Sequence, residues 1–578
     1  MIEALREIGI VCGKKDAISE NPFLGKDPSL CKVINICIKE KGGEYSFNEV
    51  RLEDFNSNYS LYLYKKKAAQ GANYTPCGLV AGDIEKTIKG RIYGWFNGDK
   101  KFIGIEKVLE INKEKITEQI KSIERDKKTN YLLTISINDK HLGEYQEFKE
   151  EMFNRCAEKQ KGVSTDDGTC SLCSAKGSVF GDIAPLSSYT LDKQCYIAGG
   201  FEKIKGWKNF PLCLSCSNYL QQGKETMEKY LKFRLGGVAY YLIPRCVINF
   251  QENLPDLMNV YKNYEDKKID TVKLKKISAE EDDYILPIMQ DVNDIFLLTF
   301  LFYEKISAKF MIHMVLEDIY PSRLRELFKA KEKAENHEYL KNVTFAKKSV
   351  KDVEFYFGTL REFIKKEFSK SNSLDQYLNL TEKIFKKISI DKGLIMNLLI
   401  EKIRESFRGE GYYDLIVLKA QVILNFLLAL ELIKNTMEVN ELSELGIKNN
   451  LSEKIEKFFK ENEGTFYNAQ TKSSFLLGVL TKNLLNIQYN ERGSNPFIKR
   501  LKNLTMNEKD IRSLYPQIIN KLEEYDSNYY QQLEEIISAY LTLSGTNWKI
   551  SVDEINYYFV LGLTLYKLDI FKLQKEEK

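Results

Sequence analysis

Histidine is scarce in this sequence: His141, His313 and His337 are the only three among 578 residues, and they lie far apart. Metal sites built from histidine, and acid–base catalysis by histidine, therefore have little to draw on. The phosphate-binding motif G-x-x-x-x-G-K-[ST] of P-loop ATPases is missing, as are H-E-x-x-H, an adjacent His–Asp pair and a His-Asn-His arrangement. These absences argue against the familiar hydrolases and leave open a nuclease built from Asp and Glu alone.

An excess of charge of one sign is missing too. The 86 Lys and Arg residues are nearly balanced by 82 Asp and Glu residues, which gives a formal net charge of +4. A uniformly basic, histone-like coat is therefore excluded, and any nucleic-acid surface must be local. Apolar residues make up 43% of the chain, so most of it should fold. Its length predicts roughly three or four structural units.

The chain contains no segment typical of a secretory signal or of a membrane span. Its first residues, MIEALREIGIVCGKKDA, lack the basic start, apolar stretch and small-residue cleavage site of a signal peptide. The most apolar window, 413–433, is long enough to cross a bilayer but contains Lys419, Gln421, Asn425 and Glu431. We interpret it as a buried helix of a bundle, and we expect a cytoplasmic protein with no membrane partner.

Cysteine is absent after Cys246, a distribution that favours reduced thiols and a metal over a disulfide framework. Two C-x-x-C pairs stand out, and their members are Cys170, Cys173, Cys213 and Cys216. Each pair can form a tight turn that aims both sulfurs at one ion, and two such turns complete a tetrahedron. The sequence therefore predicts a zinc ion with a structural role, because four thiolates leave no position open for water or substrate. Cys195, between the pairs, is an alternative ligand if one pair is misassigned.

The fold class predicted from these patterns is an α+β N-terminal region with an inserted four-cysteine zinc-ribbon lobe, followed by an all-α C-terminal helical bundle. From about residue 352 onward, apolar residues recur at three- and four-residue spacing, and no fixed-period repeat is present. The predicted domains are 1–160 (N-terminal α+β), 161–225 (zinc-binding lobe), 226–350 (the rest of the α+β region) and 351–578 (helical).

Local patterns place individual elements within these domains. Strands are expected at 32–39 and 45–52, joined by a hairpin turn, and at 60–66, 131–137, 237–249 and 310–316. Helices are expected at 144–159 and from Pro321 onward. In the helical domain they are expected at 352–369, 374–388, 393–407, 412–438, 451–462, 473–487, 508–524, 528–542 and 552–570.

Residues 78–101 combine glycines, basic residues and aromatic rings. Glycine allows close backbone approach, basic residues can meet phosphates, and an aromatic ring can stack on a base or wedge between base pairs. The candidate nucleic-acid-binding residues in this stretch are Lys86, Lys89, Arg91, Trp95, Lys100 and Lys101. A glycine-rich hairpin whose aromatic residues face the core is the structural alternative, and both interpretations stay open.

Two further basic groups are candidates for the same role. In the cysteine lobe, the lysines close to Trp207 in the sequence could contact a nucleic-acid duplex or a neighbouring subunit of a complex; they are Lys203, Lys205 and Lys208. In the helical domain, Lys499, Arg500 and Lys502 follow Pro496-Phe497 and could contact phosphates of a displaced single strand. A solvated charged face is the alternative explanation for each group.

Several stretches resemble the large subunit of the type I-B CRISPR Cascade, a crRNA-guided surveillance complex. The resemblance is carried by FEKIKGWKNFPLCLSC at 201–216 with YTLDK and AGG before it, by LGGVAYYLIP at 235–244, by FLLG at 475–478 through NPF at 495–497 to Tyr525, and by EINYYFVLG at 554–562. It extends from the cysteine region to the C-terminus, and the first 150 residues match less distinctively.

The resemblance implies a non-catalytic subunit that helps recognise the protospacer-adjacent motif, stabilises the R-loop and recruits the helicase-nuclease in antiviral defence. The implied partners are crRNA, target double-stranded DNA, the helicase-nuclease and the Cascade backbone subunits, including the one that binds the 5′ handle of the crRNA. In this family the C-terminal helical domain resembles the separate small subunit, which can be made from an internal start. Met396 or Met437 would begin products of plausible size, although either could equally be an ordinary core methionine.

Two other function classes stay open at this point. One is a zinc-ribbon nuclease or nucleic-acid-modifying enzyme, which would cleave or modify nucleic acid without partners. The other is a zinc-containing scaffold that makes no contact with nucleic acid.

Overall fold

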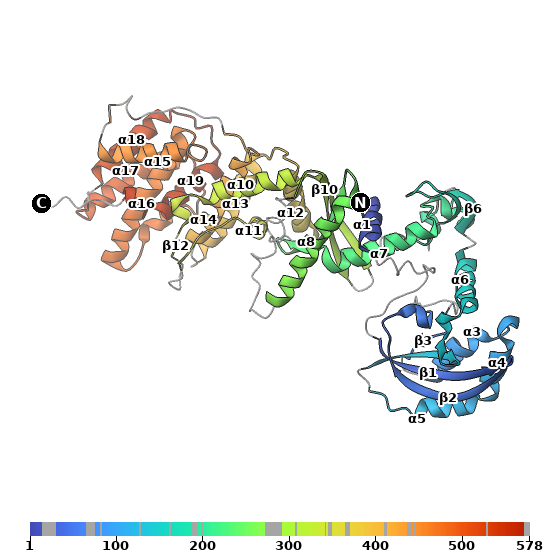
Figure 1. The fold of residues 1–578 in the computed structure, drawn as a ribbon. Coiled ribbons are helices and arrows are strands. Elements are labelled where there is room, and N and C mark those ends of the chain that lie inside the picture. The colour runs from blue at the N-terminus through green and yellow to red at the C-terminus, as the bar shows by residue number, and fades with distance from the viewer. Residues whose placement is uncertain are drawn as a thin grey trace. The chain divides into compact units, whose positions relative to one another are not determined.

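The computed structural model (Figure 1) describes residues 1–13, 30–64, 75–80, 84–126, 129–160, 163–185, 189, 191, 193–198, 200–271, 292–306, 309–341, 343–344, 350–364, 370–409, 413–435, 442, 446–447, 449–527 and 530–571. These residues pack into two compact units. The first comprises Met1–Lys229 with Leu254–Met258, and the second comprises Tyr230–Asn253 with Asn259–Lys578.

The first unit contains a mixed five-stranded sheet with strand order β2-β1-β4-β3, and β5 pairs with β4 at its end. The strands are β1 (Leu30–Lys41), β2 (Glu44–Asp54), β3 (Gly78–Leu79), β4 (Asn130–Ile137) and β5 (Lys140–His141). The predicted hairpin between the first two strands is confirmed: Lys41 pairs with Glu44, and Gly42 and Gly43 both have positive φ, as a tight two-residue hairpin turn requires. Strands β1 and β4 run parallel although they are far apart in the sequence.

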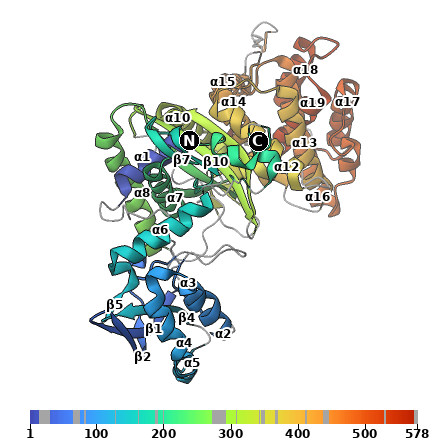
Figure 2. The same ribbon diagram turned by 90° about the vertical axis from the view of Figure 1, so that its right-hand side faces the viewer.

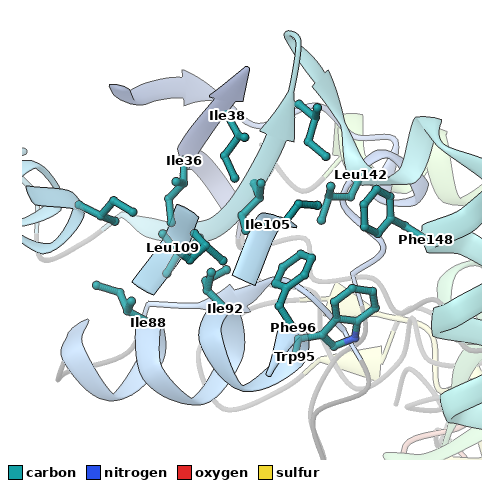
Figure 3. Close-up of a cluster of buried hydrophobic side chains, with 14 of the residues drawn as sticks. Ile36, Ile38, Ile88, Ile92, Trp95, Phe96, Ile105, Leu109, Leu142 and Phe148 are labelled. Carbon is teal, nitrogen blue, oxygen red and sulfur yellow. The ribbon is translucent and has the colours of Figure 1, made fainter. Parts of the chain in front are cut away.

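Helices cover one face of this sheet. They are α2 (Ile84–Thr87), α3 (Gly94–Phe96), α4 (Ile103–Ile111), α5 (Lys113–Ser122) and α6 (Gln146–Gln160), with the short helices η3 (Ile88–Tyr93), η4 (Lys100–Phe102) and η5 (Leu142–Glu144) between them. Their apolar side chains meet those of β1 in one core, in which Ile88, Ile92, Trp95 and Phe96 lie beneath the sheet (Figure 3).

Two predictions in this region were wrong. Residues 84–96 of the glycine-rich stretch form helix rather than a loop or a hairpin, and the buried residues Ile88, Ile92, Trp95 and Phe96 recur at helical spacing. The alternative that aromatic residues of this stretch face the core is confirmed for Trp95 and Phe96. The strand expected at 60–66 is absent from its described residues, where η2 (Tyr59–Tyr62) stands instead. The Asn58 side chain accepts a hydrogen bond from the Ser60 N–H, and this local cap competes with strand pairing.

The cysteine lobe follows α6 in the same unit. It contains the hairpin β6 (Ser164–Thr169) and β7 (Lys176–Phe180), the short helices η7 (Gln194–Tyr196) and η8 (Lys203–Lys208), and α7 (Leu214–Tyr230). The first helix of the chain, α1 (Ile2–Cys12), crosses α7 closely, because a Cβ added at Gly9 or at Gly223 would overlap a backbone carbonyl of the other helix.

The second unit begins with an antiparallel sheet of strand order β11-β10-β9-β8. The strands are β8 (Lys232–Leu235), β9 (Val238–Cys246), β10 (Phe296–Ile306) and β11 (Lys309–Ile319), accompanied by α10 (Pro321–Glu335), η10 (Glu338–Leu340) and the two-residue pair β12 (Val343–Thr344) and β13 (Val350–Lys351). Helix α8 (Phe250–Thr271) belongs to this unit except for its residues Leu254–Met258, which belong to the first. The strands predicted at 237–249 and 310–316 and the helix predicted from Pro321 are confirmed. On one face of the sheet Tyr240, Phe300 and Phe302 are fully buried against one another.

The remainder of this unit is mainly helical, as predicted, although the helix expected at 352–369 is confined to Phe357–Glu362 among its described residues. Figure 2 shows α13–α19 gathered together. Its helices are α11 (Phe357–Glu362), α12 (Lys370–Phe385), α13 (Lys392–Arg408), α14 (Tyr413–Ala429), α15 (Asn450–Glu461), α16 (Ala469–Arg492), η12 (Pro496–Leu501), α17 (Glu508–Glu524), α18 (Gln531–Leu543), α19 (Val552–Leu565) and η13 (Asp569–Phe571). Side chains that accept a hydrogen bond from a first-turn N–H mark five of the starts; they belong to Asp391, Asn449, Asn468, Asn507 and Ser551.

Helices α16 and α19 cross at a pair of glycines. A Cβ added at Gly478 would overlap the Phe559 carbonyl group, and one added at Gly562 would overlap the Phe475 carbonyl group. The two backbones can approach this closely only because neither helix carries a side chain at the crossing point.

The polar residues of α14 are satisfied inside the bundle. The Gln421 amide donates to the Asn425 side-chain oxygen at 2.7 Å, and its own oxygen accepts from the Tyr557 hydroxyl at 2.8 Å. The Asn425 amide donates to the Tyr339 hydroxyl at 3.2 Å, and the Thr465 hydroxyl lies at 3.1 Å from the Gln421 amide. Helix α14 is therefore a core helix whose buried polar groups have partners. None of the helices in the described ranges has both the length and the apolar character needed to cross a membrane.

Candidate metal centre and nucleic-acid interface

The first cysteine pair lies in the turn of the β6–β7 hairpin. The Cys170 N–H donates to the Ala175 carbonyl at 3.0 Å, and the Ser174 N–H donates to the Cys170 carbonyl at 2.9 Å. Ser174 has a positive φ of 59°, which lets the chain turn back after Cys173. The reversal brings both sulfurs of the pair to one side of the turn.

The second pair lies at the start of α7. Leu212 pairs with Phe180 at the end of β7, and the Ser171 N–H donates to the Pro211 carbonyl at 2.8 Å, so the chain before Cys213 is hydrogen-bonded to the hairpin. Helix α7 then carries Cys216 at its first turn. Backbone hydrogen bonds between the two turns therefore hold the two pairs beside each other.

The four sulfurs lie within 4.8 Å of one another. The Cys173 and Cys213 sulfurs are 3.7 Å apart, which is too long for a disulfide and close to the ~3.8 Å expected between two thiolates that share a tetrahedral ion with bonds of about 2.3 Å. Cys170 and Cys216 are buried, whereas Cys173 and Cys213 lie nearer the surface. Cys195 is exposed and is not part of the cluster. The donor set thus fits one metal ion.

The local environment favours ionisation at one of the four thiols. Burial alone would raise the pKa of Cys170, but hydrogen bonds from the backbone N–H groups of Cys213, Leu172 and Cys173 bring that pKa down to about 7. Burial raises the pKa of Cys213 and of Cys216, and the neighbouring sulfurs raise that of Cys216 further. A cation bound among them would favour the thiolate forms and release protons on binding.

The structure places the candidate residues of 78–101 in different environments. Trp95 is fully buried, and the Arg155 guanidinium covers its ring at 4.3 Å, so its ring cannot stack on a base while this core is closed. Lys101 forms an ion pair with Glu151 at 3.0 Å, and Arg91 is half-buried beside the Gly78 backbone. Lys89 and Lys100 are exposed, and Lys86 lies in α2 with its side chain outside the described part of the chain.

The basic residues of the cysteine lobe lie on η8. Lys203 and Lys208 are exposed, while Lys205 forms an ion pair with Glu202 at 2.7 Å. Trp207 is half-buried, with the Lys208 ammonium 5.5 Å from its ring centre. The sequence patterns did not single out Tyr196 and Phe201, which are exposed aromatic residues of this lobe. The two glycines before Phe201, Gly199 and Gly200, could have indicated an unusual backbone conformation at this point of the sequence.

The basic residues after α16 lie beside a strained turn. Lys499 and Arg500 are exposed at the end of η12, and Lys502, Asn503 and Leu504 then adopt three consecutive left-handed conformations. Such a conformation costs roughly 1–2 kcal/mol for each non-glycine residue.

Buried polar groups hold this turn in place. The Leu504 carbonyl accepts from the Arg404 guanidinium at 2.9 Å, and the Asn556 side chain bonds both the N–H and the carbonyl of Met506. Lys502 pairs with Asp510 at 2.6 Å. The exposed basic pair therefore stands on a fixed backbone.

The two candidate internal starts differ in what the structure shows. Met396 lies inside α13 and is fully buried, so it is a core residue in the full chain. A product beginning there would keep most of α13 and all later helices. Met437 lies outside the described residues, between α14 and α15, and a product beginning there would lack both α13 and α14.

Three family models match the chain in succession. All three describe the CRISPR-associated protein TM1802 (cas_TM1802): its N-terminal domain matches residues 1–154, its central domain residues 167–319, and its C-terminal domain residues 355–577. A search of curated proteins found no match. The central model contains all four clustered cysteines, and the C-terminal model covers the helical bundle. Because these matches together span most of its length, the chain belongs to the CRISPR-associated protein TM1802 family.

Proposed function

We propose that this chain is the non-catalytic large subunit of a type I-B CRISPR Cascade complex. In that role it helps recognise the protospacer-adjacent motif, stabilises the R-loop and recruits the helicase-nuclease in antiviral defence. The observation that carries the proposal is the run of three family matches over one chain, together with the resemblance of the cysteine region and the helical domain to that subunit.

The cysteine cluster is proposed to hold one structural zinc ion. Four thiolates complete a tetrahedron and leave no coordination position for water, so a metal bound there would fix the lobe rather than activate a nucleophile. Its role would be to lock the β6–β7 turn to the start of α7, which are otherwise joined through a few backbone hydrogen bonds of the chain just before Cys213. Metal analysis of the purified chain tests this, and a sample that folds without bound metal contradicts it.

The contacts with nucleic acid are proposed to come from the exposed basic residues. These are Lys89, Lys100, Lys203, Lys208, Lys499 and Arg500. In a guide-RNA complex the sequence along the target is read by base pairing, so the protein needs mainly backbone contacts and a short motif-reading surface. Lys101, Lys205 and Lys502 are engaged with carboxylates and would have to exchange those partners for phosphates.

The decisive experiment is purification of the tagged chain from its native host. We expect a short guide RNA and the Cascade backbone subunits to co-purify with it. Both should remain bound after washing at moderate salt in the absence of ribonuclease. A chain that elutes alone contradicts the assignment to this complex. If the chain alone cleaves DNA or RNA, and a cysteine variant lacking metal does not, the zinc-ribbon nuclease becomes the better explanation.

A further inference from the structure

The cysteine lobe exposes three large apolar side chains within one short segment. Tyr196, Phe201 and Ile204 are 52%, 56% and 65% exposed. Phenylalanine and isoleucine side chains are more often buried in a hydrophobic core. The same segment also contributes to an ordinary small core, in which Leu191 and Ile197 are buried. The three exposed residues are therefore not needed to close the lobe.

Phe201 is exposed on an unfavourable backbone. Its φ is 65°, directly after Gly200 with φ 85°, and a bulky side chain is disfavoured in this left-handed region. Glycine would occupy the position without strain. Strain of this kind persists where the conformation serves a purpose, so the exposed ring is better explained by a bound partner than by packing.

The segment is held by hydrogen bonds from the end of η8. The Asn209 side chain accepts from the Ala198 N–H at 2.6 Å and donates to the Tyr196 carbonyl. Because η8 is a 3₁₀ helix with three residues per turn, Ile204 and Trp207 lie on one side of it. The apolar side chains are thus attached to a fixed frame.

The same segment carries exposed positive charge. Lys203 and Lys208 are exposed and make no ion pair with any described residue, and the Lys193 ammonium lies 5.9 Å from the Tyr196 ring centre. Glu202 is engaged with Lys205. Protein–protein interfaces are depleted in lysine, whereas proteins that bind single strands combine aromatic rings with basic residues. The combination favours nucleic acid with accessible bases.

We infer that Phe201 stacks on unpaired bases of single-stranded nucleic acid, that Tyr196 and Ile204 of the same segment add apolar contacts, and that Lys203 and Lys208 contact the phosphates. The inference rests on the proposed function, in which an R-loop offers a displaced DNA strand. In this arrangement the apolar side chains of the segment contact the bases, and the two lysines contact the phosphate backbone of the nucleic acid.

The test is binding of the full-length chain to a labelled single-stranded oligothymidylate over a range of salt concentrations, with a duplex of the same length in parallel. Phe201→Ala should weaken single-strand binding roughly five- to 150-fold without changing its salt slope, because stacking releases no counterions. The double variant K203A/K208A should instead lower the slope by about 1.4, since each phosphate contact on a single strand contributes about 0.7. Duplex binding should change less in F201A.

Matched variants separate stacking from folding. Phe201→Gly removes the ring and also the backbone strain, so it should bind as weakly as F201A while melting at the same or a higher temperature. Phe201→Trp should retain affinity. The controls are Tyr489→Ala, which removes a 60% exposed ring in the helical domain, and K107A/K454A, which removes two exposed lysines elsewhere; both should bind oligothymidylate like the unaltered chain.

An F201A chain that binds oligothymidylate as tightly as the unaltered chain would overturn the inference. If that chain also no longer co-purifies with backbone subunits, the segment is a protein-docking surface instead. Neither result touches the proposed function, which fails separately if the unaltered chain brings down no guide RNA.

Discussion

The crossing of α16 and α19 lets the packing of the helical domain be tested with a single methyl group. In Gly478→Ala the new Cβ would lie 3.0 Å from the Phe559 carbonyl carbon and closer still to its oxygen. Ordinary carbon contacts are about 3.5–4.0 Å, so the helices must separate by at least roughly 0.5–1 Å along a buried crossing. The obstacle is backbone and cannot rotate away as a side chain would.

The expected change in local stability is the difference between two opposing contributions. Overpacking a well-filled core costs typically about 1–3 kcal/mol, and a backbone clash belongs at the upper end of that range. Alanine recovers about 1 kcal/mol through its better helix propensity. We expect a net loss of about 2 kcal/mol or more in local stability, which corresponds to exchange of the α16 and α19 amides roughly 30 times faster under conditions where exchange reports the opening equilibrium.

Hydrogen exchange followed by mass spectrometry provides the measurement, because it reads each unit of this multi-unit chain separately. Peptides from β1 and β4 serve as an internal reference. Gly90→Ala is the matched control: a Cβ there meets nothing within 4 Å, so exchange should be unchanged or slower. The double variant G478A/G562A should cost clearly less than the two single variants together, since helices already forced apart accept the second methyl group. Unchanged exchange in Gly478→Ala would refute the close crossing.

Three other predictions follow from the site. Cys213→Ser should lower the metal content of the purified chain to near zero and make the lobe sensitive to protease, as measured by metal analysis and limited proteolysis. The double variant K499A/R500A should weaken single-strand binding by the assembled complex and lower its salt slope by about 1.4, as measured by binding titrations at several salt concentrations. Expressed separately, a product beginning at Met396 should be soluble and helical by circular dichroism, whereas one beginning at Met437 should aggregate because it lacks the buried helix α14.

Controls accompany each of these. Cys195→Ser should leave the metal content unchanged, because its sulfur is outside the cluster. The exposed Lys454 and Lys509 of the same unit serve as the comparison for the basic pair, and their replacement should leave the slope as it was. A soluble, cooperatively melting product from the later start would contradict the importance assigned to α14.

The sequence was most informative where a pattern is local. The spacing of Cys170, Cys173, Cys213 and Cys216 is enough to bring four sulfurs together, because each pair needs only one tight turn. Helical periodicity likewise located the C-terminal helices. The expected start at residue 473 was four residues late, since Asn468 caps α16 ahead of the first periodic apolar residues.

Errors occurred where tertiary packing decides the structure. Glycines at 90 and 94 suggested a loop, but Ile88, Ile92 and Trp95 form an apolar helical face whose burial outweighs the poor helix propensity of glycine. Strand β10 was not predicted, because a continuous apolar run such as its sequence is equally compatible with a buried helix. The parallel pairing of β1 with β4 joins segments about 100 residues apart, which no local pattern encodes.

The hydrogen-bonded side chains around α14 constrain how this family can vary. Gln421 and Asn425 each bond more than one partner, among them Tyr557, Tyr339 and Thr465, in a buried interior where bulk solvent cannot replace a lost bond. A substitution at any one of these five residues leaves a polar atom of its neighbour without a hydrogen-bond partner. Simultaneous replacement of the set by apolar residues of similar shape would be nearly neutral for stability. Homologous chains should therefore either retain this set intact or have exchanged its members together.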